Sequence, residues 1–225
     1  GLASAIAGLR ERLIEGQAAL AAAYQSHPDA RAYLRGRSDL VDSILCALWA
    51  LAEMPADMAL LAVGGYGRRK LYPYSDVDVL VVLPELPEPE LESQIQTLIG
   101  QFWDLGLAIS HSVRTIDECI EASQSDITVQ TALFESRSIC GNPRLADELT
   151  SAIKSSMNIE QFIAAKLAEQ EERHLRYAFS AFSLEPNVKE SPGGLRDLQS
   201  IAWIARAAGF LTDGTPWISL QKHGL

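Results

Sequence analysis

Residues 63–79 read Val-Gly-Gly-Tyr-Gly-Arg-Arg-Lys-Leu-Tyr-Pro-Tyr-Ser-Asp-Val-Asp-Val, and this stretch decides the fold that we expect. It begins at the end of one apolar run, 58–63, and leads into a second apolar run, 77–83. Short apolar runs bounded by glycine or proline are typical of buried strands. We therefore predict two strands, joined by a glycine turn and a polar loop.

The second predicted strand begins with two aspartates, Asp76 and Asp78. Because residues i and i+2 point to the same face of a strand, both carboxylates should share one face while Val77 and Val79 enter the core. Neighbouring carboxylates repel each other unless a cation lies between them. Mg²⁺ takes carboxylate oxygens together with substrate phosphates, so the pair predicts a Mg²⁺ site, in which Mn²⁺ could substitute. Two such ions can hold the attacking and leaving oxygens of a phosphoryl transfer.

The glycine turn supplies the other half of the predicted site. Gly64 and Gly65 have no Cβ atom, so backbone N–H groups there can closely approach a triphosphate. Arg68 begins a basic run, 68–70, that could offset phosphate charge. With Ser75, these residues form the nucleotide-binding set that we expect. Each feature alone is common in turns, strand edges and surface loops, but all of them in this order are rare by chance.

The rest of the chain surrounds this stretch with helices and one further strand. Apolar residues at helical spacing predict a helix at 2–24 and a second one that begins near residue 40, capped by Ser38 or Asp39, and ends near Pro55. A helix face over 95–103, a third strand at 107–113 and a helix opened by the capping box of Thr115 and Glu118 follow. Beyond residue 145 the pattern is helical, apart from a polar loop at 183–194.

These elements predict an α+β protein with three parts. Residues 1–57 would form N-terminal helices, residues 58–144 a core with a small mixed sheet, and residues 145–225 a helical domain.

Composition narrows the class of protein. The 225 residues carry a formal charge of −10, whereas a protein that binds nucleic-acid backbones is usually basic, so we expect no nucleic-acid partner. We find no stretch of about 18 uncharged apolar residues and expect no membrane association. The three cysteines are widely spaced, which argues against a disulfide framework and suits the reducing cytoplasm.

The order of the glycines and aspartates resembles the nucleotidyltransferase superfamily of DNA polymerase beta. The longer segments, Gly64-Gly-Tyr-Gly-Arg and Leu71-Tyr-Pro-Tyr-Ser-Asp-Val-Asp, are similar to the bacterial PII uridylyltransferase/uridylyl-removing enzyme family. Two further segments fit that family: His111-Ser-Val-Arg-Thr, and Ser191-Pro-Gly-Gly-Leu-Arg-Asp. The resemblance extends over nearly the whole chain, to about residue 206.

The resemblance implies a polymerase-beta-like core that transfers a uridylyl group from UTP to a tyrosine hydroxyl of the trimeric PII signalling protein, releasing pyrophosphate. Asp76 and Asp78 would hold Mg²⁺, and Gly64 and Gly65 would line the triphosphate. Two alternatives stay open: adenylyl transfer from ATP to a PII-like or other acceptor, and a degenerate nucleotide-binding regulatory module.

The chain departs from the family pattern in two respects. The superfamily usually has a third carboxylate on a later strand, but the expected strand at 107–113 carries none. Asp126 is the nearest catalytic candidate, although it could equally cap a helix, and Glu135 is the next. Members of the family also carry a His-Asp hydrolase domain and two regulatory domains, which this sequence lacks, so we expect the chain to be a fragment.

Overall fold

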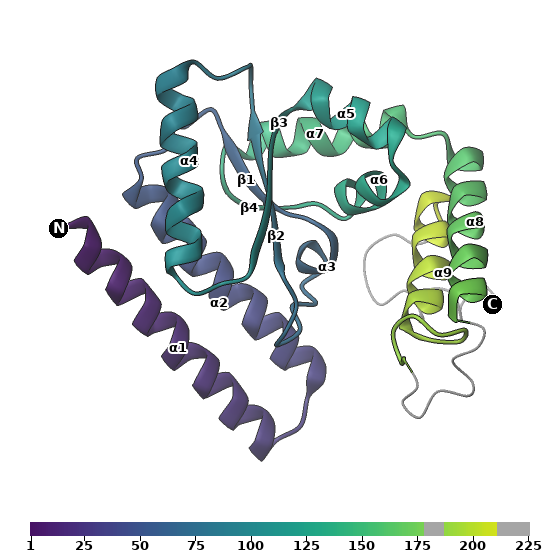
Figure 1. Cartoon of the computed structure of the whole chain (residues 1–225), viewed down its shortest axis with the longest axis horizontal. Helices are drawn as coiled ribbons and strands as arrows, with labels where there is room; N and C mark the ends of the chain where they lie inside the picture. Colours follow the sequence, from purple (N-terminus) through teal and green to yellow (C-terminus); the bar gives the residue numbers. More distant parts are fainter. Residues whose placement is uncertain (178–186, 211–225) are drawn as a thin grey trace. The chain divides into compact units, whose positions relative to one another are not determined.

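The computed structural model describes residues 1–177 and 187–210 (Figure 1). The chain divides into two compact units, Gly1–Ser155 and Ser156–Leu225. The first unit contains a four-stranded sheet, and the described part of the second is helical. The α+β class predicted from the sequence is therefore confirmed. The predicted polar loop at 183–194 is described only from residue 187 onward.

The sheet of the first unit is mixed, with strand order β3-β2-β1-β4. Strands β1 and β2 are antiparallel, as are β1 and β4, whereas β2 and β3 are parallel. The strand bounds are β1 (Ala59–Ala62), β2 (Val77–Leu83), β3 (Ile109–Thr115) and β4 (Arg137–Gly141). The prediction was correct for β2, one residue too long at each end for β1, and two residues too early for β3. Strand β4 was not predicted.

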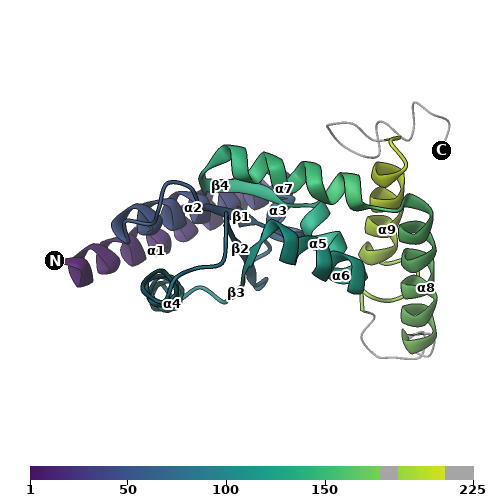
Figure 2. The ribbon, with the colours of Figure 1, turned by 90° about the horizontal axis from the view of Figure 1, so that it is seen from above.

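Helices cover both faces of the sheet. In Figure 1, α2 and α4 lie on one side of the strands, and α5, α6 and α7 lie on the other. The helix bounds are α1 (Leu2–Ser26), α2 (Ala30–Leu51), α3 (Gly64–Gly67), α4 (Pro89–Asp104), α5 (Ile116–Ser125), α6 (Ile127–Phe134) and α7 (Pro143–Ser156). The predicted break at His27-Pro28-Asp29 separates α1 from α2, and the two helices run side by side (Figures 1 and 2).

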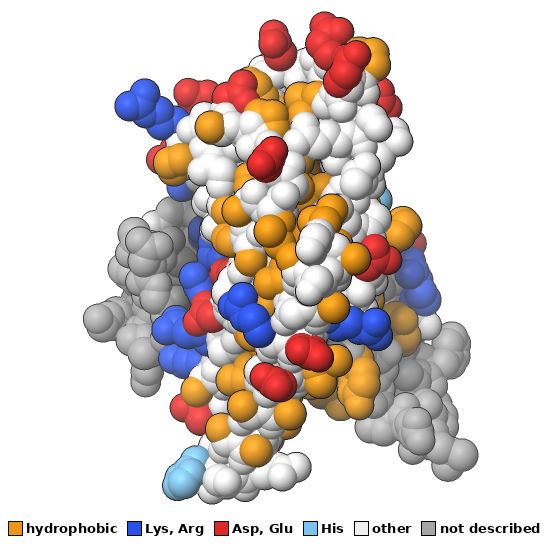
Figure 3. All heavy atoms as spheres, turned by 90° about the vertical axis from the view of Figure 1, so that its left-hand side faces the viewer, with side chains coloured by type: hydrophobic (Ala, Val, Ile, Leu, Met, Phe, Trp, Pro, Cys, Tyr) orange, Lys and Arg blue, Asp and Glu red, His pale blue; other side chains and the backbone are white. Residues whose placement is uncertain are grey.

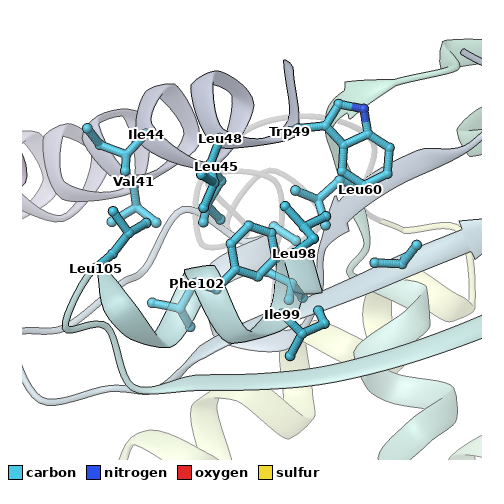
Figure 4. Packing of buried hydrophobic residues seen from close by; sticks show 14 of the residues in the cluster. Val41, Ile44, Leu45, Leu48, Trp49, Leu60, Leu98, Ile99, Phe102 and Leu105 are labelled. Atoms are coloured by element: carbon cyan, nitrogen blue, oxygen red, sulfur yellow. The ribbon is translucent and has the colours of Figure 1, made fainter. Parts of the chain in front are cut away.

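Each face of the sheet has its own hydrophobic core, because alternate residues of a strand point to opposite sides. Val77, Val79 and Val81 belong to the larger cluster, with α2 and α4, as predicted for the first two. Leu80 and Val82 belong to the smaller cluster, with α5, α6 and α7. Figure 4 shows the larger cluster, in which apolar side chains of α2 and α4 meet above the strands.

Helix α2 begins about ten residues earlier than the sequence analysis predicted. Asp29 is its N-cap and accepts a hydrogen bond from the backbone of Ala32 at 3.0 Å. Ser38, one of the two predicted caps, is buried inside the helix and donates to the Leu34 carbonyl. Asp39, the other one, is also inside the helix and pairs with Arg69. The apolar stripe that guided the prediction starts at residue 40, because the first part of α2 is mostly exposed or half-buried.

Helix α5 confirms the predicted capping box: Thr115 accepts from the Glu118 backbone at 3.3 Å, and the Glu118 carboxylate accepts from the Thr115 backbone at 2.8 Å. Helix α7 packs its buried face into the smaller core. The side of the first unit that carries α1 and α4 faces the reader in Figure 3, where apolar side chains lie among charged ones.

The described part of the second unit contains α8 (Ile159–Tyr177) and α9 (Leu195–Ala207), which contact each other. Trp203 of α9 is 5% exposed, and the Lys166 ammonium of α8 lies 4.5 Å from the centre of its ring. The interaction of a cation with an aromatic face stabilises such a pair and helps Lys166 to be buried. Within the described residues, no helix is both long enough and apolar enough to span a membrane.

Candidate functional site

The glycine turn follows β1 directly and has the shape of a single helical turn, α3. Gly64 adopts φ +56°, a left-handed conformation that favours glycine. Backbone hydrogen bonds close the turn: the Gly67 amide donates to the Val63 carbonyl at 3.0 Å, and the Lys70 amide donates to the Gly65 carbonyl at 3.0 Å. The predicted glycine turn is therefore an ordered feature with a defined backbone path.

The turn and the aspartate strand lie side by side, as the sequence analysis required. The Val63 amide donates to the Asp78 carbonyl at 3.0 Å. A Cβ atom placed on Gly64 would lie 3.6 Å from Oδ2 of Asp78. The first glycine of the turn and the second aspartate of the pair are thus in direct proximity, although they are far apart in the sequence.

The two aspartates differ in their surroundings. Asp78 is the second residue of β2 and is half-buried, whereas Asp76 precedes the strand and is exposed. Asp78 shares the strand face of Leu80 and Val82, which is the face covered by α5, α6 and α7. Ser75 is exposed in the loop that leads to Asp76, and its amide donates to the Tyr72 carbonyl at 3.1 Å.

The basic residues after the turn are anchored by carboxylates. Arg68 forms an ion pair with the buried carboxylate of Glu135. Its guanidinium remains beside the turn, because a Cβ atom on Gly65 would lie 3.8 Å from Nη2 of Arg68. Burial, followed by the nearby charge of Arg68, lowers the pKa of Lys70, while Glu135 opposes the shift. The turn is therefore bordered by positive charge whose position is fixed by other residues.

Strand β3 carries no carboxylate, which agrees with the sequence analysis. Ser110 of β3 pairs with Asp78 of β2, so the position beside the second aspartate is occupied by a hydroxyl group. His111 pairs with Val79 and therefore faces the other side of the sheet, where its ring packs against Trp103 with ring centres 6.0 Å apart. This contact gives His111 a packing role and places it away from the Asp78 face.

The two candidates for a third carboxylate both have structural roles. Asp126 is the N-cap of α6, and its carboxylate accepts from the Thr128 amide at 2.7 Å. Glu135 is 5% exposed and binds Arg68. The structure therefore realises the helix-capping alternative for Asp126, and its predicted catalytic role stays a prediction.

Three residues that the sequence analysis did not single out hold the turn in place. Tyr66 of α3 donates its hydroxyl proton to Asp42 of α2 at 2.6 Å. Arg137, the first residue of β4, donates to both oxygens of the same carboxylate, at 2.7 and 3.0 Å. Arg137 and Asp42 are 95 residues apart, and no local pattern in the sequence connects them.

The glycine-rich segment of the second unit also forms an ordered turn. Gly194 is the N-cap residue of α9, and Gly193 adopts φ +79°. The carboxylate of Asp197 accepts from the Gly193 amide at 2.7 Å, from the His174 ring at 2.8 Å, and from Arg173. Although burial would raise it, the pKa of Asp197 is lowered, because these three donors favour the charged form.

The donor set at the first turn fits a magnesium ion that is bound together with a phosphorylated substrate. No group of three or more possible metal ligands occurs within the described residues. Mg²⁺ is usually held by one or two carboxylates plus substrate phosphates, so an aspartate pair is sufficient. The glycine position closest to Asp78 is one at which a side chain would occupy the space beside the carboxylate.

By its fold and its site, the chain is an α+β protein that presents two aspartates and a glycine turn at one end of a small mixed sheet. A family model described as GlnD PII-uridylyltransferase matches residues 161–225. The chain is 47% identical, over 99% of its length, to a bifunctional uridylyltransferase/uridylyl-removing enzyme of Aromatoleum aromaticum. It belongs to this family, and the resemblance inferred from the sequence is confirmed.

Other relatives carry the same name. A protein of Nitrosospira multiformis is 46% identical over 96% of the chain, and one of Burkholderia lata is 50% identical over 84% of it. The matches with the Aromatoleum, Nitrosospira and Burkholderia proteins cover 25%, 25% and 22% of those relatives. The chain therefore spans about a quarter of the length of the curated relatives that it matches.

Proposed function

We propose that the first unit is a polymerase-beta-like nucleotidyltransferase core that transfers a uridylyl group from UTP to a tyrosine of a PII signalling protein and releases pyrophosphate. The observation that carries this proposal is the proximity of Gly64 to the carboxylate of Asp78. It places a close backbone approach for a triphosphate beside a carboxylate that can take a metal ion. The names of the relatives support uridylyl transfer as the reaction.

In this proposal each part of the site has a separate task. Asp76 and Asp78 would hold Mg²⁺, which supplies charge stabilisation at the reacting phosphate. Gly64 and Gly65 would bind the triphosphate through backbone N–H groups. Arg68, held in place by Glu135, would offset negative charge beside the turn. Ser75 lies in the loop before the aspartates, where it can contact the nucleotide.

The catalytic test is the double variant Asp76→Asn plus Asp78→Asn. The substitutions preserve shape but remove both charges, so we expect the transfer of labelled UMP to trimeric PII in the presence of Mg²⁺ to fall at least about a thousandfold. The far-UV circular dichroism spectrum should be unchanged. Asp104→Asn, at the exposed end of α4, is the matched control and should retain full activity. Wild-type turnover in the double variant would show that the site is misassigned.

The substrate nucleotide is tested separately. Thermal shift of the wild-type chain with Mg²⁺ and each nucleoside triphosphate should be largest with UTP. A larger shift with ATP would favour adenylyl transfer instead.

One observation favours a second candidate function, a regulatory module that binds nucleotide without transferring it. Strand β3 presents Ser110, not a carboxylate, beside Asp78. The superfamily to which the chain is similar usually uses three carboxylates. The two functions differ in one outcome: a binding module would bind UTP and Mg²⁺ with no pyrophosphate released in the presence of PII, whereas the transferase would release one pyrophosphate for each PII tyrosine modified.

A further inference from the structure

Helix α2 contacts the segment between β1 and β2 at three points. Arg37 donates to the carbonyl oxygens of Leu71 at 3.1 Å and Pro73 at 3.4 Å. Asp39, one turn before Asp42, pairs with Arg69. Asp42 then binds Tyr66, inside the glycine turn itself. The helix therefore follows the whole connection from the glycine turn toward the aspartates.

Asp42 lies at the centre of the most buried of these contacts. Its side chain is 16% exposed, and that of its bidentate partner Arg137 is 19% exposed. The guanidinium of Arg137 also lies 5.5 Å from the centre of the Tyr66 ring, and its Nε donates to the Gly67 carbonyl at 3.3 Å. One carboxylate thus fixes two side chains, and both connect to the glycine turn.

The charge state of this cluster is stable across ordinary pH. Burial first, and then the neighbouring Asp42 carboxylate, raises the pKa of Tyr66, so its hydroxyl group stays protonated and donates to the carboxylate. Bidentate contacts between arginine and a carboxylate are among the strongest hydrogen bonds in proteins and restrict orientation as well as distance. The cluster can therefore fix both the position and the direction of the turn.

The glycine turn has little freedom to move without consequences at the aspartates. A Cβ atom on Gly67 would lie 2.1 Å from the Glu135 carbonyl, so the end of the turn is in close backbone contact with the segment that leads into β4. The start of the turn is equally close to Asp78 on β2. A displacement of Tyr66 would therefore change how the turn faces Asp78.

We propose that Asp42 is a positioning residue for nucleotide binding: through Tyr66 and Arg137 it holds the glycine turn in the orientation that receives the triphosphate, without touching the substrate. The proposal rests on the proposed function of the first unit. It assigns a role to α2, which the sequence divided from the core. The expected signature is weaker nucleotide binding with an almost unchanged rate of the bound complex, because the aspartates themselves remain in place.

The first test is Asp42→Asn in the full chain. The amide keeps the size of the side chain but removes the charge that Arg137 binds. Hydrogen bonds to charged groups are strong enough that we expect the KM for UTP to rise about tenfold. The kcat should stay within about twofold. Assays are run well below the Tm of each variant, so that a loss of folded protein does not contribute.

Asp29→Ala is the matched control, because it removes a carboxylate from the same helix. Asp29 caps the start of α2 and contacts the Ala32 amide, and no contact with the glycine turn is printed by the structure at that end of the helix. This variant should lower the Tm and leave the KM for UTP unchanged. An equal rise of KM in both variants would show that Asp42 acts only through helix stability and would overturn the proposal.

A second variant covers the case in which Asp42→Asn does not fold. Tyr66→Phe removes a single hydrogen bond and keeps the buried ring, so a smaller rise in KM, about threefold, is expected. A KM equal to that of the wild type in this variant would also overturn the proposal.

A readout without substrate separates this inference from the proposed function. Hydrogen exchange of the amides of residues 67–70, which close the turn, should be faster in Asp42→Asn than in Asp29→Ala. If the wild-type chain bound no nucleotide, the proposed function would fail, whatever the exchange rates. If the wild-type chain bound UTP and Asp42→Asn bound it equally well, only the positioning role would fail.

Discussion

The two glycine turns of the molecule use the same device for different ends. Each turn is held by a buried carboxylate that also binds an arginine: Asp42 with Arg137 at the first turn, and Asp197 with Arg173 at the second. At the first turn the carboxylate comes from a remote helix. At the second it comes from the helix that the turn begins, and it accepts a hydrogen bond from the turn itself.

This difference determines what each turn can offer to a ligand. The first turn is held from behind, so Asp76 and Asp78 of the neighbouring strand are not needed to support it. The Gly193 amide of the second turn is already bound by Asp197. A turn whose anchor is remote can present backbone groups and separate carboxylates together, whereas a turn that is anchored by its own helix uses its carboxylate for stability.

The largest effect should follow from Gly67→Ala, because the new Cβ atom would meet backbone that cannot move aside. Its position is 2.1 Å from the Glu135 carbonyl oxygen, and we expect a loss of about 3 kcal/mol or more in the free energy of unfolding of the first unit. Gly194→Ala, with carbonyl oxygens of Ser191 and Val188 at 2.7 Å, should destabilise the second turn by a smaller amount, about 1–2 kcal/mol. Urea unfolding, followed by circular dichroism, measures both.

Gly100→Ala is the control for both glycine variants. Gly100 lies inside α4, and no atom is within 4 Å of the Cβ position. Alanine favours helix by about 0.5–1 kcal/mol over glycine, so this variant should be slightly more stable than the wild type. An unchanged unfolding midpoint for Gly67→Ala would contradict the close packing of the first turn against the start of β4.

The sequence predicted the buried parts of this arrangement better than its supports. Strands β1 and β2 are apolar runs with every residue but Asp78 buried, so their composition alone was sufficient. Strand β4, Arg137-Ser-Ile-Cys-Gly, lies at an edge of the sheet and contains no fully buried residue, so no apolar run marks it. Its pairing with β1 depends on tertiary contacts that the local pattern does not encode.

The candidate site shows the same division. Gly64, Gly65, Asp76 and Asp78 lie in one short stretch, and a strand-turn-strand pattern was enough to predict that they meet. The contacts of Asp42, Tyr66 and Arg137 join α2, the turn and β4 across long separations in the chain. For the same reason the sequence separated residues 1–57 from the core, whereas α2 packs against the sheet and holds the turn.

A smaller effect should follow from Asp197→Asn, which tests whether the second turn is purely structural. The change leaves the Arg173 guanidinium, 7% exposed, without its counter-charge, so we expect about 2 kcal/mol of destabilisation at neutral pH. Hydrogen exchange of the α9 amides measures it. UTP binding by the first unit should not change, and a loss of UTP binding would show that the two turns are not functionally distinct.

The same variant predicts a pH dependence with a definite sign. The pKa of Asp197 is lower in the folded protein than in the unfolded chain, because its donors favour the charged form despite burial. Its stabilising contribution is therefore present above the unfolded pKa, about 3.9, and is lost as the pH falls through the lower folded value. Protection of α9 in the wild type should decrease in that acidic range, and the decrease should be smaller in Asp197→Asn.

The smallest effect concerns the two thiols behind the first turn. Cys46 lies one helical turn beyond Asp42 on α2, and Cys140 follows Arg137 on β4. The hydrogen bond from Cys140 lowers the pKa of Cys46, although burial and Asp42 oppose the shift. Burial raises the pKa of Cys119 to about 11. Since the thiolate is the nucleophile, iodoacetamide should modify Cys46 roughly tenfold faster than Cys119 at pH 8.

Cys140→Ala tests the physical cause of this reactivity. Without the donor, the pKa of Cys46 should return toward its ordinary value, so its alkylation at pH 8 should slow and its pH profile should move upward. An unchanged profile would mean that the thiols are not in contact and that α2 and β4 are farther apart than the bonds of Asp42 and Arg137 require. Because the thiols and the Asp42 cluster join the same helix to the same strand, thiol reactivity reports directly on the support of the first turn, and residues 156–225 contain no cysteine that could confuse the measurement.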